Sequence, residues 1–347
     1  MKAKLSLQPN SNYFSHRPMA IPQLVMFFVA LLFVSPAALA SQPPSLDTRL
    51  TWLPTGTVEI YAIDSPRLFT MPTEPKMPIS TLLALSTCLS GPLLQFDTKR
   101  SGISPLQEKT LISSLRGSQL RPGQSRNGSK SSSWHQVDIF NFKEPVKEEM
   151  ISYLQSQGVK HIAGGKDPIW KAETQGLSRF PSPSYFLAMP DNYTIVIGKS
   201  SDQRILLESL QRYHHKTPCA FSLNHPAWKY VSKQSDFWSI AFLPLAVPAS
   251  NLCNDEFTEA ATGVVAQFSA KTNIYQIACL TKTANSLALV RERVKQARIK
   301  ESSRLKLKSI SPRVTEIDAY SMNHTEFDLM MILALMQALL CRQVILG

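Results

Sequence analysis

The residues most able to do chemistry in this sequence are three histidines and a cysteine in one short stretch: His214, His215, Cys219 and His225. Imidazole nitrogens and thiolates bind zinc, but a zinc site needs three or four of them to converge. The histidine pair instead falls in the last turn of a predicted helix, where a histidine interacts favourably with the negative end of the helix dipole. We therefore expect helix-end capping here, and neither a metal nor another cofactor.

Two motifs of catalytic type are incomplete. Gly164-Gly165-Lys166-Asp167 has the glycines and lysine of a phosphate-binding loop, but it lacks the first glycine and the hydroxyl residue of the full pattern. Ser303-Arg304-Leu305-Lys306 matches S-x-x-K but lies in a charged run. An enzyme would need a site assembled from distant residues, such as His161, His214 or His225 with carboxylates.

Basic residues gather in two segments of a chain whose net charge is +12. Residues 291–308 hold eight basic and two acidic side chains, and residues 99–130 hold seven and one, so each segment has a net charge of +6. A local excess of cations attracts anions more strongly than the same charge spread over a whole surface. The alternative is a solvated face without a partner.

A helix predicted over residues 284–299 presents the first basic segment. Its apolar positions Leu287, Val290, Val294 and Ala297 recur at helical spacing and would face a sheet, which turns the cations outward. Lipid headgroups or polysaccharides are anionic partners of the right kind, and no specific nucleic-acid motif is present. The candidate anion-binding residues are Arg291, Arg293, Lys295, Arg298 and Lys300.

The first forty residues resemble a signal peptide in their order of features. Lys2, Lys4 and Arg17 precede an apolar run from Leu24 to Val34, and small residues lead to Ala40. Eleven residues span about 16 Å as a helix, against roughly 30 Å of bilayer hydrocarbon. We expect cleavage after residue 40 and export to the periplasm or the extracellular space, with a net charge of +9 left. An uncleaved membrane anchor is the alternative.

These features predict an exported, non-catalytic binding protein with a basic surface. An exported enzyme of hydrolase type, with a site built from scattered residues, is the other hypothesis. All five cysteines follow residue 40, and none are spaced as C-x-x-C. If a disulfide forms, Cys219 and Cys253 are the pair that we expect, because both lie in loop-like sequence.

The elements that must position these residues indicate an α+β fold with antiparallel sheets. We predict an N-terminal unit over 41–116, with a strand at 57–63 and helices at 79–89 and 104–115. Residues 117–133 are polar and basic, without an apolar face, and predict a mobile linker.

Residues 134–245 contain the most regular patterns. Strands are expected at 136–142, 184–189, 193–198 and 237–243, with helices over 146–157 and after Ser200. Pro190-Asp191-Asn192 is a turn signal between the two middle strands. The order β-α-β-β-α-β is typical of a ferredoxin-like unit with its helices packed on one face of the sheet.

Residues 246–347 predict a further α+β unit. Its order of elements is compatible with a second, partial copy of the unit at 134–245. A hairpin is expected over 263–269 and 274–280, followed by the helix at 284–299, a strand at 314–320 and a helix at 325–341. The last helix contains the apolar run 329–336, which is too short to span a bilayer easily. A core helix is therefore expected, with a membrane tail as the alternative.

Overall fold

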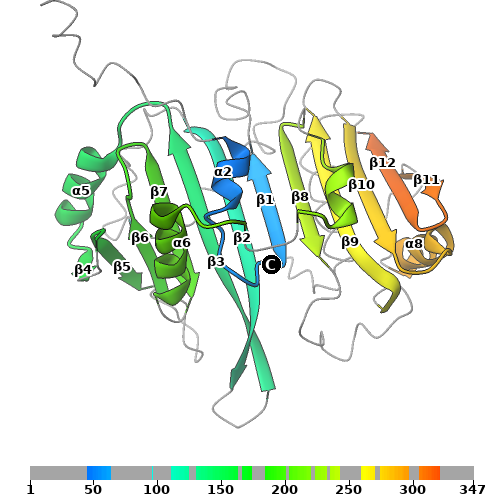
Figure 1. Ribbon diagram of the computed structural model, residues 1–347, viewed down its shortest axis with the longest axis horizontal. Coiled ribbons are helices and arrows are strands. Elements are labelled where there is room, and N and C mark those ends of the chain that lie inside the picture. The colour runs from blue at the N-terminus through cyan, green and yellow to red at the C-terminus, as the bar shows by residue number, and fades with distance from the viewer. Residues whose placement is uncertain are drawn as a thin grey trace, which may run out of the picture. The chain divides into compact units, whose positions relative to one another are not determined.

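A computed structural model gives the fold (Figure 1). The chain divides into two compact units, Met1–Gln42 and Pro43–Gly347, and all residues with a described structure lie in the second. The structure describes residues 45–63, 96, 111–124, 130–162, 166–173, 184–200, 203–219, 223–232, 235–242, 259–269, 274–296 and 305–320. None of the helices in these ranges is long and apolar enough to cross a membrane.

One antiparallel sheet of twelve strands carries the described residues, in the order β11-β12-β10-β9-β8-β1-β2-β3-β7-β6-β5-β4. The strands are β1 Glu59–Ile63, β2 Leu111–Gln124, β3 Lys130–Phe142, β4 Lys160–Ile162, β5 Ile169–Glu173, β6 Ser184–Ala188, β7 Thr194–Ser200, β8 Phe237–Phe242, β9 Ala261–Ser269, β10 Ile274–Thr281, β11 Leu305–Ser311 and β12 Val314–Tyr320. Their side chains alternate between the two faces, so each face has its own apolar core.

The helices are divided between these two cores. They are α2 Leu46–Leu50, α5 Lys147–Ser156, α6 Arg204–His215 and α8 Ser286–Gln296, with the 3₁₀ helix η2 at Pro226–Tyr230. Helices α5 and α8 contribute buried residues to one core, and α2, α6 and η2 contribute to the other. In Figure 1, α6 lies in front of β3 and β7, which it contacts. The expectation that the helices pack on one face is therefore corrected.

Helix α6 approaches the sheet closely and holds the segment that precedes β1. A Cβ atom on Gly198 of β7 would lie 3.0 Å from Leu206 Cβ, so only glycine leaves room for the helix here. Ser209 Oγ donates a hydrogen bond to the Trp52 carbonyl at 2.9 Å, and Arg212 Nε donates to the Thr51 carbonyl at 2.9 Å. These bonds hold residues 51 and 52, which precede β1, against the last two turns of α6.

Most predicted elements of residues 134–245 are present, but the ferredoxin-like sheet order is not confirmed. The hairpin β6–β7, the helices α5 and α6 and the strand β8 all lie where they were expected. A ferredoxin-like unit pairs its first strand with its fourth, whereas β1 and β2 here lie between β3 and β8. Two strands from outside the predicted unit have thus entered its sheet.

The predicted linker is wrong in its described parts. Residues 117–124 belong to β2 and residues 130–133 to β3, and the two strands pair in continuous register from Gly117↔Val137 to Gln124↔Lys130. Backbone pairing across the hairpin satisfies a polar sequence that has no apolar face to bury. Residues 111–115, predicted as the end of a helix, are also in β2. Strands β4, β5 and β11 were not predicted.

The other predictions for residues 246–347 agree with the structure where it describes the chain. Strands β9, β10 and β12 and helix α8 match the expected hairpin, strand and helix. The signal peptide and the predicted helices at 79–89 and 325–341 lie outside the described residues, as does the membrane-tail alternative.

Candidate functional site

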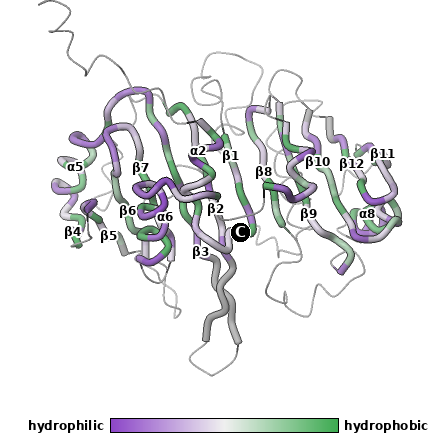
Figure 2. Tube along the Cα trace, viewed as in Figure 1, coloured by the Kyte–Doolittle hydropathy of each residue, from purple (hydrophilic) through white to green (hydrophobic). Residues whose placement is uncertain are grey.

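Helix α8 presents three of the five predicted basic residues on its outer side. Val290 and Val294 are buried in the core that α8 shares with β10, β11 and β12. Arg291 and Lys295 are exposed, and Arg293 is partly exposed. Hydrophilic residues colour much of this helix in Figure 2. The apolar side thus orients the helix, and its basic side is turned toward solvent.

The charge of this face is reduced by one acid. Lys295 Nζ lies 4.0 Å from Glu292 Oε2, an exposed pair at i,i+3 spacing whose strength is small in water. Arg298 and Lys300, the other two predicted residues, lie outside the described residues. We call Arg291, Arg293 and Lys295 the α8 basic face. With Glu292 it has a net charge of +2.

Two further lysines of the same basic segment, Lys306 and Lys308, lie on the other side of the sheet, opposite acidic residues. Leu305 and Leu307 of β11 pack into the core under α8, so Lys306 and Lys308 alternate to the opposite face. Lys306 faces Asp318 and Lys308 faces Glu316 across the β11–β12 pair. Burial raises the pKa of Glu316, Asp318 adds to this rise, and Lys308 opposes it.

A second group of charged residues was not predicted, because its members come from four separate strands. Arg116 Nε of β2 donates to Asp138 Oδ1 of β3 at 2.5 Å, and the Asp138 side chain is fully buried. Lys199 of β7 faces Tyr185 of β6, with Nζ 5.9 Å from the ring centroid. Among the described residues, Asp138 Oδ2 has no hydrogen-bond partner.

Burial shifts the pKa values of this group. It raises the pKa of Asp138 more than the charge and hydrogen bond of Arg116 lower it. Burial also lowers the pKa of Lys199, with repulsion from Arg116 as a smaller cause, and raises the pKa of Tyr185. Shifted pKa values are typical of functional sites but also of structural ion pairs. Since Asp138 is closed to solvent, we assign the Arg116–Asp138 pair to the architecture of the sheet.

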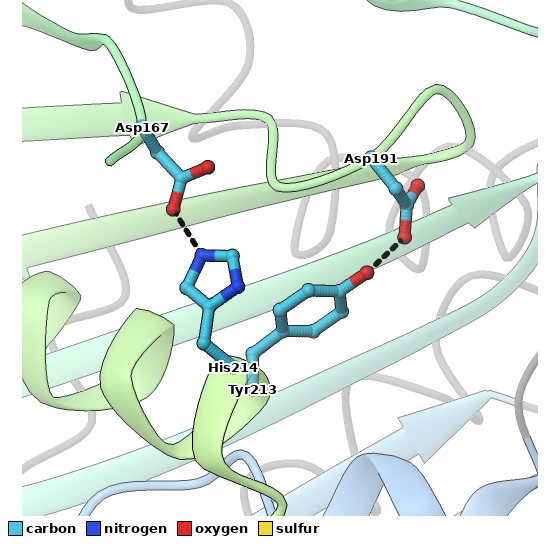
Figure 3. A network of polar contacts seen from close by, with 4 residues as sticks. All are labelled: Asp167, Asp191, Tyr213 and His214. Atoms are coloured by element: carbon cyan, nitrogen blue, oxygen red, sulfur yellow. Dashed lines mark hydrogen bonds and ion pairs between the residues drawn. The ribbon is translucent and has the colours of Figure 1, made fainter.

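The last turn of α6 is held by two aspartates from the neighbouring connections between strands (Figure 3). His214 Nε2 lies 2.5 Å from Asp167 Oδ2, and the Tyr213 hydroxyl donates to Asp191 Oδ2 at 2.8 Å. Asp191 Oδ2 also accepts from Thr194 Oγ1 at 2.9 Å. Burial, followed by the bond to Asp191, raises the pKa of Tyr213.

This network continues into the sheet through neutral side chains. Asn141 Nδ2 donates to Thr194 Oγ1 at 3.0 Å, and Ser113 Oγ donates to Asn141 Oδ1 at 3.4 Å. Serine, asparagine and threonine here satisfy one another in the interior, as buried polar groups must. The chain of bonds from β2 to α6 therefore has a structural explanation.

His161 and His225 have separate partners, so the described residues do not bring these histidines together as the enzyme hypothesis requires. His161 lies against Trp170 with ring centroids 5.5 Å apart, and His225 Nδ1 accepts from the Ala227 amide at 3.2 Å to cap η2. His214 and His215 lie in the last turn of α6, as predicted. No three histidine, cysteine, aspartate or glutamate side chains gather for a metal within the ranges that the structure describes.

Cys219 lies close to the segment that precedes β1. Its thiol donates to the Leu50 carbonyl at a sulfur–oxygen distance of 3.6 Å. Cys253 lies outside the described residues, so its pairing with Cys219 stays a prediction. Burial raises the pKa of Cys279 to about 12, which makes this thiol a poor nucleophile.

Comparisons with known proteins add little to this description. No protein-family model and no curated protein sequence matches the chain. Among solved structures, crystal forms I, III and IV of TP0453 overlap with it at TM-scores of 0.44, 0.44 and 0.42, with sequence identities of 8%, 8% and 9%. Crystal form I covers 82% of this chain and 96% of that chain. The function is therefore argued from this chain's own residues.

Proposed function

We propose that this chain is an exported, non-catalytic binding protein that engages an anionic surface or polymer through the α8 basic face. The observation that carries this proposal is the orientation of α8. Val290 and Val294 pack the helix against the core of the sheet. Arg291 and Lys295 are exposed to solvent and do not contribute to this core. Arg298 and Lys300 continue the same basic run in the sequence.

Electrostatics sets the expected strength of this contact. A lysine or arginine close to an anionic membrane contributes about 1 kcal/mol. Three such residues supply a modest affinity that depends on ionic strength, because free salt screens exposed charges over roughly 8–10 Å at 0.10–0.15 M. The partner classes that fit are anionic lipid headgroups and acidic polysaccharides.

Vesicle cosedimentation tests this function. We expect the protein to bind vesicles that contain phosphatidylserine or phosphatidylglycerol. It should not bind vesicles of phosphatidylcholine alone. Raising the salt concentration should release it, and heparin should compete at low salt. Equal binding to anionic and neutral vesicles, or binding that salt leaves unchanged, would contradict the proposal.

Export is the second part of the proposal, and it rests on the order of charged, apolar and small residues before Ser41. Mass spectrometry of protein purified from its native host should find a mature chain that begins at Ser41. A cytosolic protein that retains residues 1–40 would exclude export by this route.

A further inference from the structure

An open pocket of about 420 Å³ lies beside the first turns of α8. Its volume is within the range of about 300–1,000 Å³ that is usual for small-molecule sites. The described residues that line it are Glu259, Ala260, Lys282, Thr283, Asn285 and Leu289. None of these residues belongs to the α8 basic face, which begins at Arg291.

Backbone and hydroxyl bonds hold the wall of this pocket in place. The Lys282 amide donates to the Ala260 carbonyl at 2.7 Å, and Thr281 Oγ1 donates to the Thr283 carbonyl at 2.8 Å. At the other end of the loop, the buried Ser286 hydroxyl lies 2.9 Å from Thr315 Oγ1. The loop from β10 to α8 is therefore fixed at both ends, which lowers the entropy lost on binding a ligand.

The charges of the pocket are opposite and remain separate. Glu259 and Lys282 are both exposed and line the same cavity. Neither forms an ion pair in the part of the chain that the structure describes, although the Lys282 amide bonds to the carbonyl of Ala260, the residue that follows Glu259. The wall of the pocket therefore contains a carboxylate and an ammonium group that a guest can contact.

The other lining side chains define the kind of guest. The Thr283 hydroxyl and the Asn285 amide can donate hydrogen bonds beside Lys282, which suits an oxyanion. Glu259 accepts from a cationic amine. Leu289 is partly buried and offers apolar contact to a carbon chain attached to the polar group.

We infer that this pocket binds a zwitterion in which an oxyanion and an amine are separated by a few bonds, as in a phosphoethanolamine group. Lys282, Thr283 and Asn285 receive the oxyanion, and Glu259 receives the amine. This ligand differs from the purely anionic partner of the α8 basic face. The inference therefore does not depend on the proposed function.

Calorimetric titration with four soluble probes tests the charge pattern. Glycerophosphoethanolamine carries both groups, glycerol 3-phosphate and ethanolamine carry one each, and glycerophosphocholine replaces the amine with a quaternary ammonium that cannot donate a hydrogen bond. We expect glycerophosphoethanolamine to bind about tenfold more tightly than each of the other three, since a charge-assisted hydrogen bond has this effect. Equal affinity for glycerophosphoethanolamine and glycerol 3-phosphate would overturn the inference.

Two substitutions assign the groups. Lys282→Gln should weaken glycerophosphoethanolamine binding about tenfold. Glu259→Gln should remove the preference over glycerol 3-phosphate while leaving glycerol 3-phosphate binding intact. Lys143→Gln and Glu148→Gln make the same charge changes at exposed positions near α5 and should bind like the unmodified protein. Wild-type affinity in both pocket variants would exclude this site.

A vesicle experiment distinguishes the source of the ligand. If the group is a lipid headgroup, phosphatidylethanolamine vesicles retain the protein and Lys282→Gln weakens the retention about tenfold. If the ligand is a free metabolite, only the soluble probe binds. Reversing the charges of Arg291, Arg293 and Lys295, which do not line the pocket, should preserve the preference for glycerophosphoethanolamine over glycerol 3-phosphate. A failure of the proposed function is then seen separately from a failure of this inference.

Discussion

Replacing Arg116 with methionine is expected to lower the free energy of unfolding by about 3–5 kcal/mol at neutral pH. The guanidinium group is the hydrogen-bond partner of Asp138, whose side chain is fully buried. Methionine keeps much of the apolar stem but leaves this carboxylate without a partner in a region of low dielectric. Chemical denaturation followed by fluorescence measures the change.

The pH dependence of this loss of stability distinguishes the effect of the broken ion pair from the effect of lost side-chain packing. Arg116 lowers the pKa of Asp138, so its removal raises the folded-state pKa further above the ordinary aspartate value of 3.8. A raised folded pKa favours the fold at low pH and disfavours it as the pH rises through that pKa. The destabilisation by Arg116→Met should therefore shrink as the pH falls toward 4.

Arg291→Met is the matched control, because Arg291 is exposed on α8. We expect it to change the free energy of unfolding by less than about 0.5 kcal/mol. The double variant Arg116→Met/Asp138→Leu removes both charges and should be more stable than Arg116→Met. Equal losses in the exposed and buried variants would show that the Arg116–Asp138 pair does not stabilise the fold.

Local patterns in the sequence predicted the elements whose stability has local causes. The alternation of residues 136–142 predicted part of β3, and Pro190-Asp191-Asn192 predicted the β6–β7 turn. The structure shows the reason for the turn, since Asp191 Oδ1 accepts from the Tyr193 amide at 2.7 Å. Helix α8 was also predicted from a local pattern, because its apolar residues recur at helical spacing.

Elements whose stability depends on distant partners were missed. Ser114, Arg116 and Ser118 are polar residues of β2, in a stretch that was predicted as the end of a helix followed by a linker from residue 117. In the sheet these residues are paired between β1 and β3 and lie on one face, where Arg116 meets Asp138. Nothing local in the sequence indicates that β1 and β2 separate β3 from β8. The ferredoxin-like order was inferred from chain order alone and therefore left out these inserted strands.

The candidate site was predicted only in part. The sequence located the basic face of α8 but counted Lys306 and Lys308 in the same segment. The structure places these two lysines on the opposite face of the sheet, across from Asp318 and Glu316 of β12. The pocket beside α8 combines Glu259 with Lys282, which come from different strand connections, so no motif marks it.

Reversing the charges of the α8 basic face is expected to abolish binding to anionic vesicles. Arg291→Glu, Arg293→Glu and Lys295→Glu together remove three favourable contacts of about 1 kcal/mol each and add repulsion. A loss of 3 kcal/mol corresponds to a dissociation constant on the order of a hundredfold larger. Because none of these side chains is fully buried, the fold should be retained.

The dissociation constant of this triple variant for phosphatidylglycerol vesicles, at physiological ionic strength, tests the account most directly. Its reference is the triple variant Lys143→Glu, Lys160→Glu and Lys216→Glu, which makes the same change in net charge at exposed positions away from α8. We predict that the α8 variant binds at least about tenfold more weakly than this reference. If the two variants bind equally, the protein's overall charge and not the α8 basic face governs binding, and the central claim is wrong.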